Sequence, residues 1–375
     1  MDIACRYIVV GAGFYGAVMA ERIANVLGEK VLVLEQRAHI GGNSYSETHI
    51  PTGIEVHKYG SHIFHTPNKK VWDYINRFSG FNQYRHKVWS SYQSELYSMP
   101  VNLLTLKKFF KKDLDEESAK CFLLSLQKST SEDSFEAKAL SSIGSELYEA
   151  FFRGYTKKQW NTDPRLLPSS TFSRLPVRYN SNTDYFDDPY QGIPLEGYSN
   201  IFKKMLSHPL IEVRLGVDFF AVKDQIPKDS LVIYSGPIDR YFKYTEGVLG
   251  WRTLDFQEEI IERGDFQGTT VVNYPEEKIP YTRIHEFRHY HPERNYRNDR
   301  SVIYKEYSRT ALEKDTPYYP INTALDQEMY KKYEKLSLNE KNVIFGGRLG
   351  SYKYFDMHHV IAMALKTFEE RFGKI

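Results

Sequence analysis

Three glycines near the start of the chain constrain its fold more than any other feature. Gly11, Gly13 and Gly16 form a G-x-G-x-x-G motif between an apolar run at 7–10 and a stretch at 17–27 whose apolar residues recur at helical spacing. A second apolar run follows at 31–34. This order predicts a βαβ unit, which belongs to a mostly parallel sheet covered by helices.

The same segment predicts a bound dinucleotide. The first glycine permits a tight turn, the second lets a pyrophosphate approach the backbone, and the third packs the helix against the strand. Glu35 ends the second strand about 20 residues after Gly16, where a carboxylate accepts from a ribose hydroxyl and disfavours the 2′-phosphate of NADP. The alternative is that the glycines serve only a tight turn.

Two further glycine pairs bear on which dinucleotide is bound. Gly41-Gly42-Asn43 follows the acidic strand, where a second backbone segment could approach a larger cofactor. Gly346-Gly347-Arg348 follows a late apolar run, and a guanidinium fork matches pyrophosphate oxygens. Each pair could be an ordinary turn. Together they favour a cofactor domain assembled from both ends of the chain, with a flavin rather than NAD.

The rest of the chain changes character several times. Residues 103–155 are polar with amphipathic stretches and predict a small helical domain, whereas 163–197 are rich in proline and predict a long irregular connection. Residues 253–307 alternate apolar and charged side chains, as an antiparallel sheet with one wet face does. We therefore expect an α/β fold with a discontinuous Rossmann-like FAD-binding domain, a small helical-bundle domain and an antiparallel β-sheet domain. The expected boundaries are 1–80, 190–240 and 338–375 for the cofactor domain, 101–165 for the helical domain, 81–100 and 241–337 for the sheet domain, and 166–189 for a mobile active-site loop and connection.

Composition excludes several functional classes. Lys plus Arg is 50 and Asp plus Glu is 48, a net charge of +2, which argues against a broad nucleic-acid-binding surface and against a polybasic membrane anchor. The longest mostly apolar stretch, 7–20, is too short to suggest a membrane span. Two cysteines make no disulfide framework, and the N-terminal residues resemble no signal peptide, so we expect a cytoplasmic protein.

Metal and side-chain nucleophile chemistry find little support in the sequence. His62 and His65, and His285, His289 and His291, resemble metal spacings only loosely, so no metal site is expected. Neither a G-x-S-x-G elbow nor a cysteine nucleophile motif is present. If covalent chemistry occurs, the flavin is the expected nucleophile.

Aromatic residues make up 15% of the chain, and tyrosine is the commonest of them. Phe151, Phe152, Tyr155 and Trp160 end the helical segment, where they could form a core or a wall on which a base stacks. Candidate anion-binding arginines are Arg174 and Arg178 in the proline-rich connection, followed by Tyr185, and Arg252 and Arg283 at strand-like positions. A diphosphate needs one or two arginines, and tyrosine hydroxyls add donors without charge.

Eight ordered motifs resemble those of the bacterial UDP-galactopyranose mutase family over essentially the full length of the chain. They are Gly11-x-Gly13-x-x-Gly16, Glu35 with Gly41 to Asn43, His57 to Thr66, Gly154 to Trp160, Tyr185-Phe186 with Tyr190 to Pro194, Pro280 to Arg283, Pro317 to Pro320, and Gly346 to Leu349 with Lys353 to Asp356. Phe355 and Ser61 depart from residues that relatives often carry. These departures leave open whether the sugar's 2-position bears a hydroxyl or an N-acetyl group.

The resemblance implies an FAD enzyme that interconverts UDP-galactopyranose and UDP-galactofuranose without net redox change, supplying furanose sugar for cell-surface polysaccharide. In that family the flavin must be reduced, and its N5 forms an adduct with the sugar while UDP leaves. Carried over by position, Arg174 and Arg283 would bind the diphosphate, Tyr185, Tyr319 and Tyr354 would donate to its phosphates, and Tyr155 would stack on uracil beside Phe151 and Phe152. Trp160 would border the sugar, and Arg252 and Asp356 would order the site. His62 would lie near the flavin N5, and Arg348 would bind the FAD pyrophosphate, with Gly42, Asn43 and Gly347 beside the cofactor.

The resemblance also implies partners. We expect UDP-galactose as substrate, a homodimer and an unidentified reductant, and neither nucleic acid nor a membrane span. Two alternatives stay open: an amine-oxidase-type FAD oxidoreductase, which would share the glycine motifs, and a flavoprotein that binds a nucleotide sugar without turnover.

Overall fold

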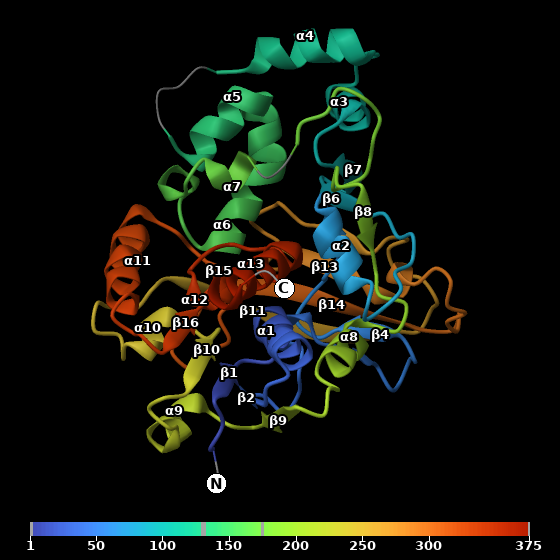
Figure 1. The fold of residues 1–375 in the computed structure, drawn as a ribbon. Helices are drawn as coiled ribbons and strands as arrows, with labels where there is room; N and C mark the ends of the chain where they lie inside the picture. Colours follow the sequence, from blue (N-terminus) through green and yellow to red (C-terminus); the bar gives the residue numbers. More distant parts are fainter. Residues whose placement is uncertain (1–2, 129–132, 174–175, 374–375) are drawn as a thin grey trace.

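A parallel sheet built from distant parts of the chain lies at the base of the molecule, in the computed structural model that describes residues 3–128, 133–173 and 176–373 (Figure 1). Its five strands run in the order β16, β10, β1, β2, β9, and every neighbouring pair is parallel. The strands are β1 (Tyr7–Val10), β2 (Val31–Glu35), β9 (Ile211–Leu215), β10 (Leu231–Tyr234) and β16 (Val343–Phe345). The predicted Rossmann-like α/β arrangement is confirmed.

Both faces of this sheet are covered, as the uninterrupted apolar strands require. Alternate residues point to opposite faces: Val9 and Val33 join the cluster under α1 (Phe14–Arg22), which continues as η1 (Ile23–Leu27), whereas Ile8 and Leu32 join a second cluster on the other side. The first cluster also holds residues of α2 (Lys69–Ile75), α8 (Tyr198–Met205) and α13 (Met357–Phe372). The second is covered by α9 (Phe219–Val222) and α10 (Ile238–Tyr241).

A seven-stranded sheet in the order β15, β11, β14, β13, β12, β6, β7 forms the middle of the molecule. The strands are β6 (Val88–Tyr92), β7 (Glu95–Met99), β11 (Trp251–Ile261), β12 (Val271–Asn273), β13 (Arg283–Glu286), β14 (Ser301–Thr310) and β15 (Tyr319–Pro320). All pairs are antiparallel except β12 with β6, which are parallel. The hairpin of β6 and β7 precedes the helical segment in sequence, so its pairing with β12 is not set by a short turn.

The helical segment stands above this sheet in Figure 1. It comprises α3 (Leu103–Phe110), α4 (Glu116–Leu126), α5 (Phe135–Leu147), η3 (Tyr148–Arg153), α6 (Gly154–Trp160), η4 (Pro164–Leu166) and α7 (Ser170–Ser173). The side chains of Asn102, Asp115 and Ser134 cap the first turns of α3, α4 and α5. Leu167 and Phe172 pack into the hydrophobic cluster of these helices.

Shorter elements complete the chain. They are η2 (Gly42–Ser44), β3 (Ser46–Thr48), β4 (Glu55–His57), β5 (Phe64–Thr66), β8 (Tyr190–Gly192), η5 (Lys223–Gln225), η6 (Phe287–Tyr290), α11 (Ala324–Ser337) and α12 (Gly347–Gly350). Strand β3 pairs with β4, and β5 pairs with β8. Within the described ranges, every helix is too short or too polar to cross a bilayer.

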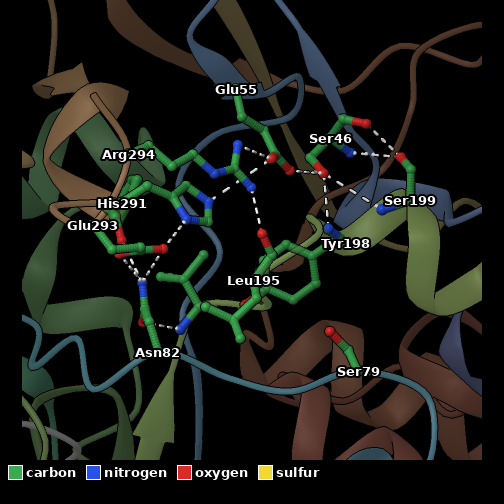
Figure 2. A network of polar contacts seen from close by, with 12 residues as sticks. Ser46, Glu55, Ser79, Asn82, Leu195, Tyr198, Ser199, His291, Glu293 and Arg294 are labelled. Atoms are coloured by element: carbon green, nitrogen blue, oxygen red, sulfur yellow. Dashed lines mark hydrogen bonds and ion pairs between the residues drawn. The ribbon is translucent and has the colours of Figure 1, made fainter. Parts of the chain in front are cut away.

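One buried carboxylate joins the small sheet of β3 and β4 to the start of α8 and to the segment after η6 (Figure 2). Glu55 on β4 accepts from Arg294, which follows η6, at 2.7 Å and from Ser46 on β3 at 2.7 Å. Ser46 Oγ in turn accepts from the N–H of Tyr198 at the start of α8 (2.9 Å). A Cβ on Gly197, which has φ +80°, would lie 1.8 Å from Glu55 Oε1, so only glycine allows this approach.

This network predicts a stability loss in the variant Arg294→Met. The Glu55 carboxylate would stay buried without its charged donor, so the free energy of unfolding should fall by about 1.5–3 kcal/mol, the range for a hydrogen bond to a charged group. Thermal and urea unfolding followed by circular dichroism measure the change. The double variant Glu55→Gln with Arg294→Met removes the orphaned charge and should recover part of the loss. A single variant as stable as the wild type would contradict this assignment.

Candidate functional site

Three glycine segments meet at the carboxyl edge of the parallel sheet. The N–H of Gly41 donates to Ala12 O in the first glycine loop (2.9 Å), and a Cβ on Gly42 would lie 3.2 Å from Gly13 Cα. The N–H of Gly346 donates to Tyr234 O at the end of β10 (3.1 Å). Segments predicted to approach one ligand from both ends of the chain are therefore neighbours, at the edge where open α/β sheets bind ligands.

The residues at this edge fit a dinucleotide. Helix α1 begins after Gly13 without a side-chain cap, which leaves the N–H groups of its first turn for an anion. A Cβ on Gly16 would lie 1.9 Å from Gly11 O, so the third glycine is required for close packing of helix on strand. Within the described part of the chain, the buried Nη1 of Arg37 has no hydrogen-bond partner, although Nη2 donates to Asn43 Oδ1 at 2.7 Å.

Glu35 lies at the same edge with both carboxylate oxygens engaged. Oε2 accepts from the N–H of Ala12 (2.8 Å) and Oε1 from the N–H of Arg37 (2.9 Å), so the carboxylate fastens the glycine loop. Each oxygen keeps a second lone pair. That the Glu35 carboxylate accepts a hydrogen bond from a ribose hydroxyl stays a prediction. Sequence reasoning missed Arg37, although its place two residues after Glu35 could have indicated it. In the structure its guanidinium lies 4.6 Å from the Tyr59 ring centroid.

A second group, which we call the aromatic wall, comprises Tyr155, Trp160, Tyr319 and Tyr354. Tyr319 and Tyr354 stack with their ring centroids 5.0 Å apart, and Trp160 lies 6.3 and 6.2 Å from them. The guanidinium of Arg283 lies 5.9 Å from the ring centroid of Tyr155. These residues come from α6, β13, β15 and the segment before α13, so the structure brings together side chains that the sequence singled out separately.

Arg348 lies between the aromatic wall and the glycine edge. Its guanidinium is 5.6 Å from the ring centroid of Tyr319 and 5.5 Å from that of Tyr354. It donates to the carbonyls of Phe355 and Tyr318. That Arg348 binds the FAD pyrophosphate stays a prediction.

Glu306 on β14 holds Arg283 in place. Its Oε1 lies 3.0 Å from Arg283 Nε, and the two side chains form an ion pair. Burial alone would lower the pKa of Arg283, but the neighbouring carboxylate outweighs it and raises that pKa well above its usual value. The arginine therefore stays charged at any working pH. Sequence reasoning missed Glu306, because its pairing with Arg283 arises from the register of β13 on β14.

Arg252 and Lys158 fasten α6 to the sheet. Arg252 is fully buried, and it donates to Gln159 O at the end of α6 (2.9 Å), to Thr310 Oγ1 (2.8 Å) and to Ser308 Oγ (3.1 Å). Lys158 Nζ donates to carbonyls of the 274–281 loop that leads into β13, among them Ile279 O at 2.8 Å. Burial lowers the pKa of Lys158 to about 8 and that of Arg252 to about 10. Lys158 was not foreseen.

His62 lies on the loop between β4 and β5 with one tautomer fixed. Its Nδ1 lies 2.7 Å from Gly60 O, and because a carbonyl only accepts, Nδ1 carries the hydrogen. Its backbone N–H donates to His57 Nδ1 (3.0 Å). Burial first, and then the charge of Arg348, lower the pKa of His62 to about 4. The ring is therefore neutral at neutral pH, with the Nε2 lone pair available.

The other predicted site residues are distributed around this centre. Phe151 and Phe152 are 5% and 8% exposed in the hydrophobic cluster of the helical segment, consistent with the core alternative. The N–H of Tyr185 donates to His86 O (2.7 Å), and Asp356 is the N-cap residue of α13. Arg174 lies outside the described residues. The substrate roles of these residues stay predictions.

One cluster in the described ranges has metal-ligand side chains: Asp265, Glu286 and His289. Glu286 accepts from the N–H groups of Phe266 and Gln267 at 2.9 Å each and from Ser301 Oγ at 2.6 Å. These bonds account for the buried carboxylate without an ion.

Comparison with known proteins gives consistent matches. A family model described as UDP-galactopyranose mutase matches residues 150–354, and one for an NAD(P)-binding Rossmann-like domain matches residues 9–78. A probable UDP-galactopyranose mutase of Klebsiella pneumoniae is 42% identical over 97% of this chain and 94% of its own length. A dTDP-fucopyranose mutase of Escherichia coli is 40% identical over 96% and 97%.

Solved structures show the same fold. A crystal structure of reduced UDP-galactopyranose mutase superposes with a TM-score of 0.76 at 16% identity, covering 99% of this chain and 96% of that one. A putrescine oxidase triple mutant gives a TM-score of 0.57 at 11% identity, covering 98% of both chains. Mutases and oxidases therefore share this architecture.

Three histidines with lowered pKa values predict a loss of stability in mild acid. Burial lowers the pKa of His62 to about 4, of His86 to about 3 and of His358 to about 4. The unfolded chain binds protons at these residues near pH 6.5, which the folded chain does not, so the free energy of unfolding should fall as the pH drops from about 6.5 towards about 4. Urea unfolding at pH 7, 6 and 5 measures this, and His62→Asn should flatten the dependence. A His62 resonance titrating near pH 6.5 would contradict the assignment.

Proposed function

The chain belongs to the UDP-galactopyranose mutase family, and we propose that it interconverts UDP-galactopyranose and UDP-galactofuranose with reduced FAD bound at the glycine edge. The observation that carries the proposal is the position of Arg283, a permanent cation held by Glu306 against the aromatic wall. An arginine fork with aromatic faces beside it suits a diphosphate joined to a base.

The glycine edge would hold the cofactor. Gly11, Gly13 and the uncapped first turn of α1 would bind its pyrophosphate, and Arg37 Nη1 offers a further donor. Bound and reduced, the flavin supplies a nucleophilic nitrogen that can take the place of the nucleoside diphosphate on the sugar, so that the net reaction involves no redox change. The FAD itself and its reduced state belong to this proposal.

The aromatic wall and its arginines would bind the nucleotide. Arg283 would hold the diphosphate and stabilise its charge as the bond to the sugar breaks, because its charged guanidinium lies beside the Tyr155 ring while Nε faces Glu306. Tyr155 would offer its ring to the base, and the hydroxyls of Tyr319 and Tyr354 would donate to phosphate oxygens. Trp160 would border the sugar, and Arg174 would add a second positive charge.

His62 would serve the sugar end of the site. Its neutral ring presents Nε2 as an acceptor, because Nδ1–H is held by Gly60 O. A sugar hydroxyl, or a proton released during ring opening, is a partner that such an acceptor can receive. The proposal also includes a homodimer, an unidentified reductant, a cytoplasmic location and delivery of the furanose to cell-surface polysaccharide. Family membership alone supports these points.

The substrate has one specific competitor. The Escherichia coli relative is named for dTDP-fucopyranose, at an identity close to that of the Klebsiella pneumoniae mutase. The second candidate function is therefore the same ring isomerisation on dTDP-fucose, which differs from UDP-galactose in the nucleoside and in the sugar.

We expect the purified yellow protein to convert UDP-galactofuranose to UDP-galactopyranose after dithionite reduction and not while oxidised. Chromatography of the sugar nucleotides measures the conversion, with UDP-N-acetylgalactosamine and dTDP-fucose as parallel substrates. Conversion of dTDP-fucose alone would establish the competitor. Hydrogen peroxide release with an amine, and no isomerisation after reduction, would establish the oxidase alternative.

Arg283→Ala should lower kcat/KM by about 10- to 100-fold, the effect of losing charged hydrogen bonds worth ~1.5–3 kcal/mol. Arg6→Ala is the matched control, because Arg6 is an exposed arginine paired with Glu29 beside the N-terminal end of β1. The flavin content of Arg283→Ala should stay at the wild-type value. Wild-type kinetics in this variant would place the diphosphate elsewhere.

A further inference from the structure

A continuous line of polar side chains, of which the two middle members are buried, joins the loop of His62 to Arg283. Ser61 Oγ lies 2.5 Å from His285 Nδ1, and His285 Nε2 lies 3.0 Å from Glu306 Oε2. The other oxygen of Glu306 lies 3.0 Å from Arg283 Nε. His285 and Glu306 are 0% and 1% exposed, so water does not compete for the hydrogen bond between them.

Strand register places three of these four residues on one face of the sheet. Arg283 and His285 are two apart on β13, so their side chains point the same way. Glu306 on β14 lies directly opposite Arg283. The loop of Ser61 approaches this face closely, since a Cβ on Gly60 would lie 3.0 Å from the Phe256 ring and 3.6 Å from Glu306 Oε2.

The hydrogen bonds in this line have a fixed direction. Burial alone would raise the pKa of Glu306, but Arg283, His285 and Thr282 outweigh it and lower that pKa, so the carboxylate is ionised and only accepts. His285 Nε2 therefore donates to Glu306. Burial lowers the pKa of His285, which stays neutral, so its Nδ1 accepts from the hydroxyl of Ser61.

A purely space-filling role explains these contacts poorly. His285 stacks 5.9 Å from Phe287 and lies 6.0 Å from Phe256, so an apolar side chain would suit the same surroundings. A buried imidazole costs free energy unless both nitrogens are partnered, and here both are. One partner, Ser61, directly precedes His62, and the other, Glu306, lies opposite Arg283 on the neighbouring strand β14.

We propose that Ser61 and His285 are positioning residues that hold His62 in register with Arg283. This rests on the proposed function, in which Arg283 binds the diphosphate and His62 faces the sugar. One substrate must meet both groups at once, and a fixed separation between them avoids reorganisation during the reaction. For this role neither residue needs to touch the substrate.

The test uses the FAD-loaded protein and the variant Ser61→Ala, which removes only the donor to His285 Nδ1. We expect kcat to fall about 10-fold, the factor for one lost buried hydrogen bond, while the Kd for UDP changes less than about 3-fold. Ser61→Thr keeps a hydroxyl and should restore kcat. Ser207→Ala is the matched control, because that exposed serine also donates one bond, to Lys204 O, far along the chain just after α8.

A second variant and a spectroscopic measurement distinguish the loss of positioning from a general loss of structure. His285→Gln keeps a donor for Glu306 but lacks the ring nitrogen that faces Ser61, so its kcat should fall as in Ser61→Ala. In ¹⁵N-histidine-labelled protein, the Nδ1 signal of His285 and the signals of His62 should both shift in Ser61→Ala and not in Ser207→Ala.

Three outcomes overturn the proposal: wild-type kcat in Ser61→Ala, unchanged His62 signals in that variant, or a fall in kcat that Ser61→Thr does not restore. Failure of the proposed function is distinguishable. Reduced wild-type protein would then convert none of the tested sugar nucleotides, and the His62 signals would still decide whether Ser61 and His285 position that ring.

Discussion

The attachment of α6 to the seven-stranded sheet depends on one buried guanidinium. Arg252 has no exposed surface, and its partners in the described part of the chain are backbone carbonyls and hydroxyls without formal charge. Burying a charge is costly. Here the cation lies at the C-terminal end of α6, where the helix dipole is negative and the last carbonyls lack intrahelical partners. A lysine has too few donors in a plane to replace this fork.

The geometry of the site follows from that attachment. Helix α6 carries Tyr155 and Trp160, whereas β13 and β14 carry Arg283 and Glu306, so the two halves keep their separation only while α6 stays on the sheet. Lys158 adds a second fastening on the same helix, through the carbonyls of the loop that enters β13. The aromatic groups on α6 and the cationic group on β13 thus come from elements that Arg252 and Lys158 hold together. This suits a site that must bind one ligand by its base and its diphosphate.

Local patterns in the sequence predicted part of this structure, and pairing between strands determined the rest. The glycine motif with its flanking apolar runs predicted β1, α1 and β2, because the turn, the helix and the strands are all encoded within 30 or so neighbouring residues. Alternation predicted strands β11 to β14 but not their register, so the contacts of Arg283 with Glu306 and of His285 with Ser61 could not be predicted. Buried polar residues such as Lys158 gave no signal, because a lysine in an amphipathic helix is usually solvated.

Because mutases and oxidases share this fold, the chemistry depends on the aromatic wall and on the arginines beside it. An amine substrate carries a positive charge at neutral pH, and a low-dielectric site lined by cations repels it. Of the two described arginines beside the aromatic wall, Arg348 hydrogen-bonds to carbonyl oxygens without formal charge, and Arg283 pairs with Glu306. The wall therefore carries an excess of positive charge that a diphosphate would neutralise. Electrostatics at this wall favour a nucleotide sugar on a fold that could equally have served an amine.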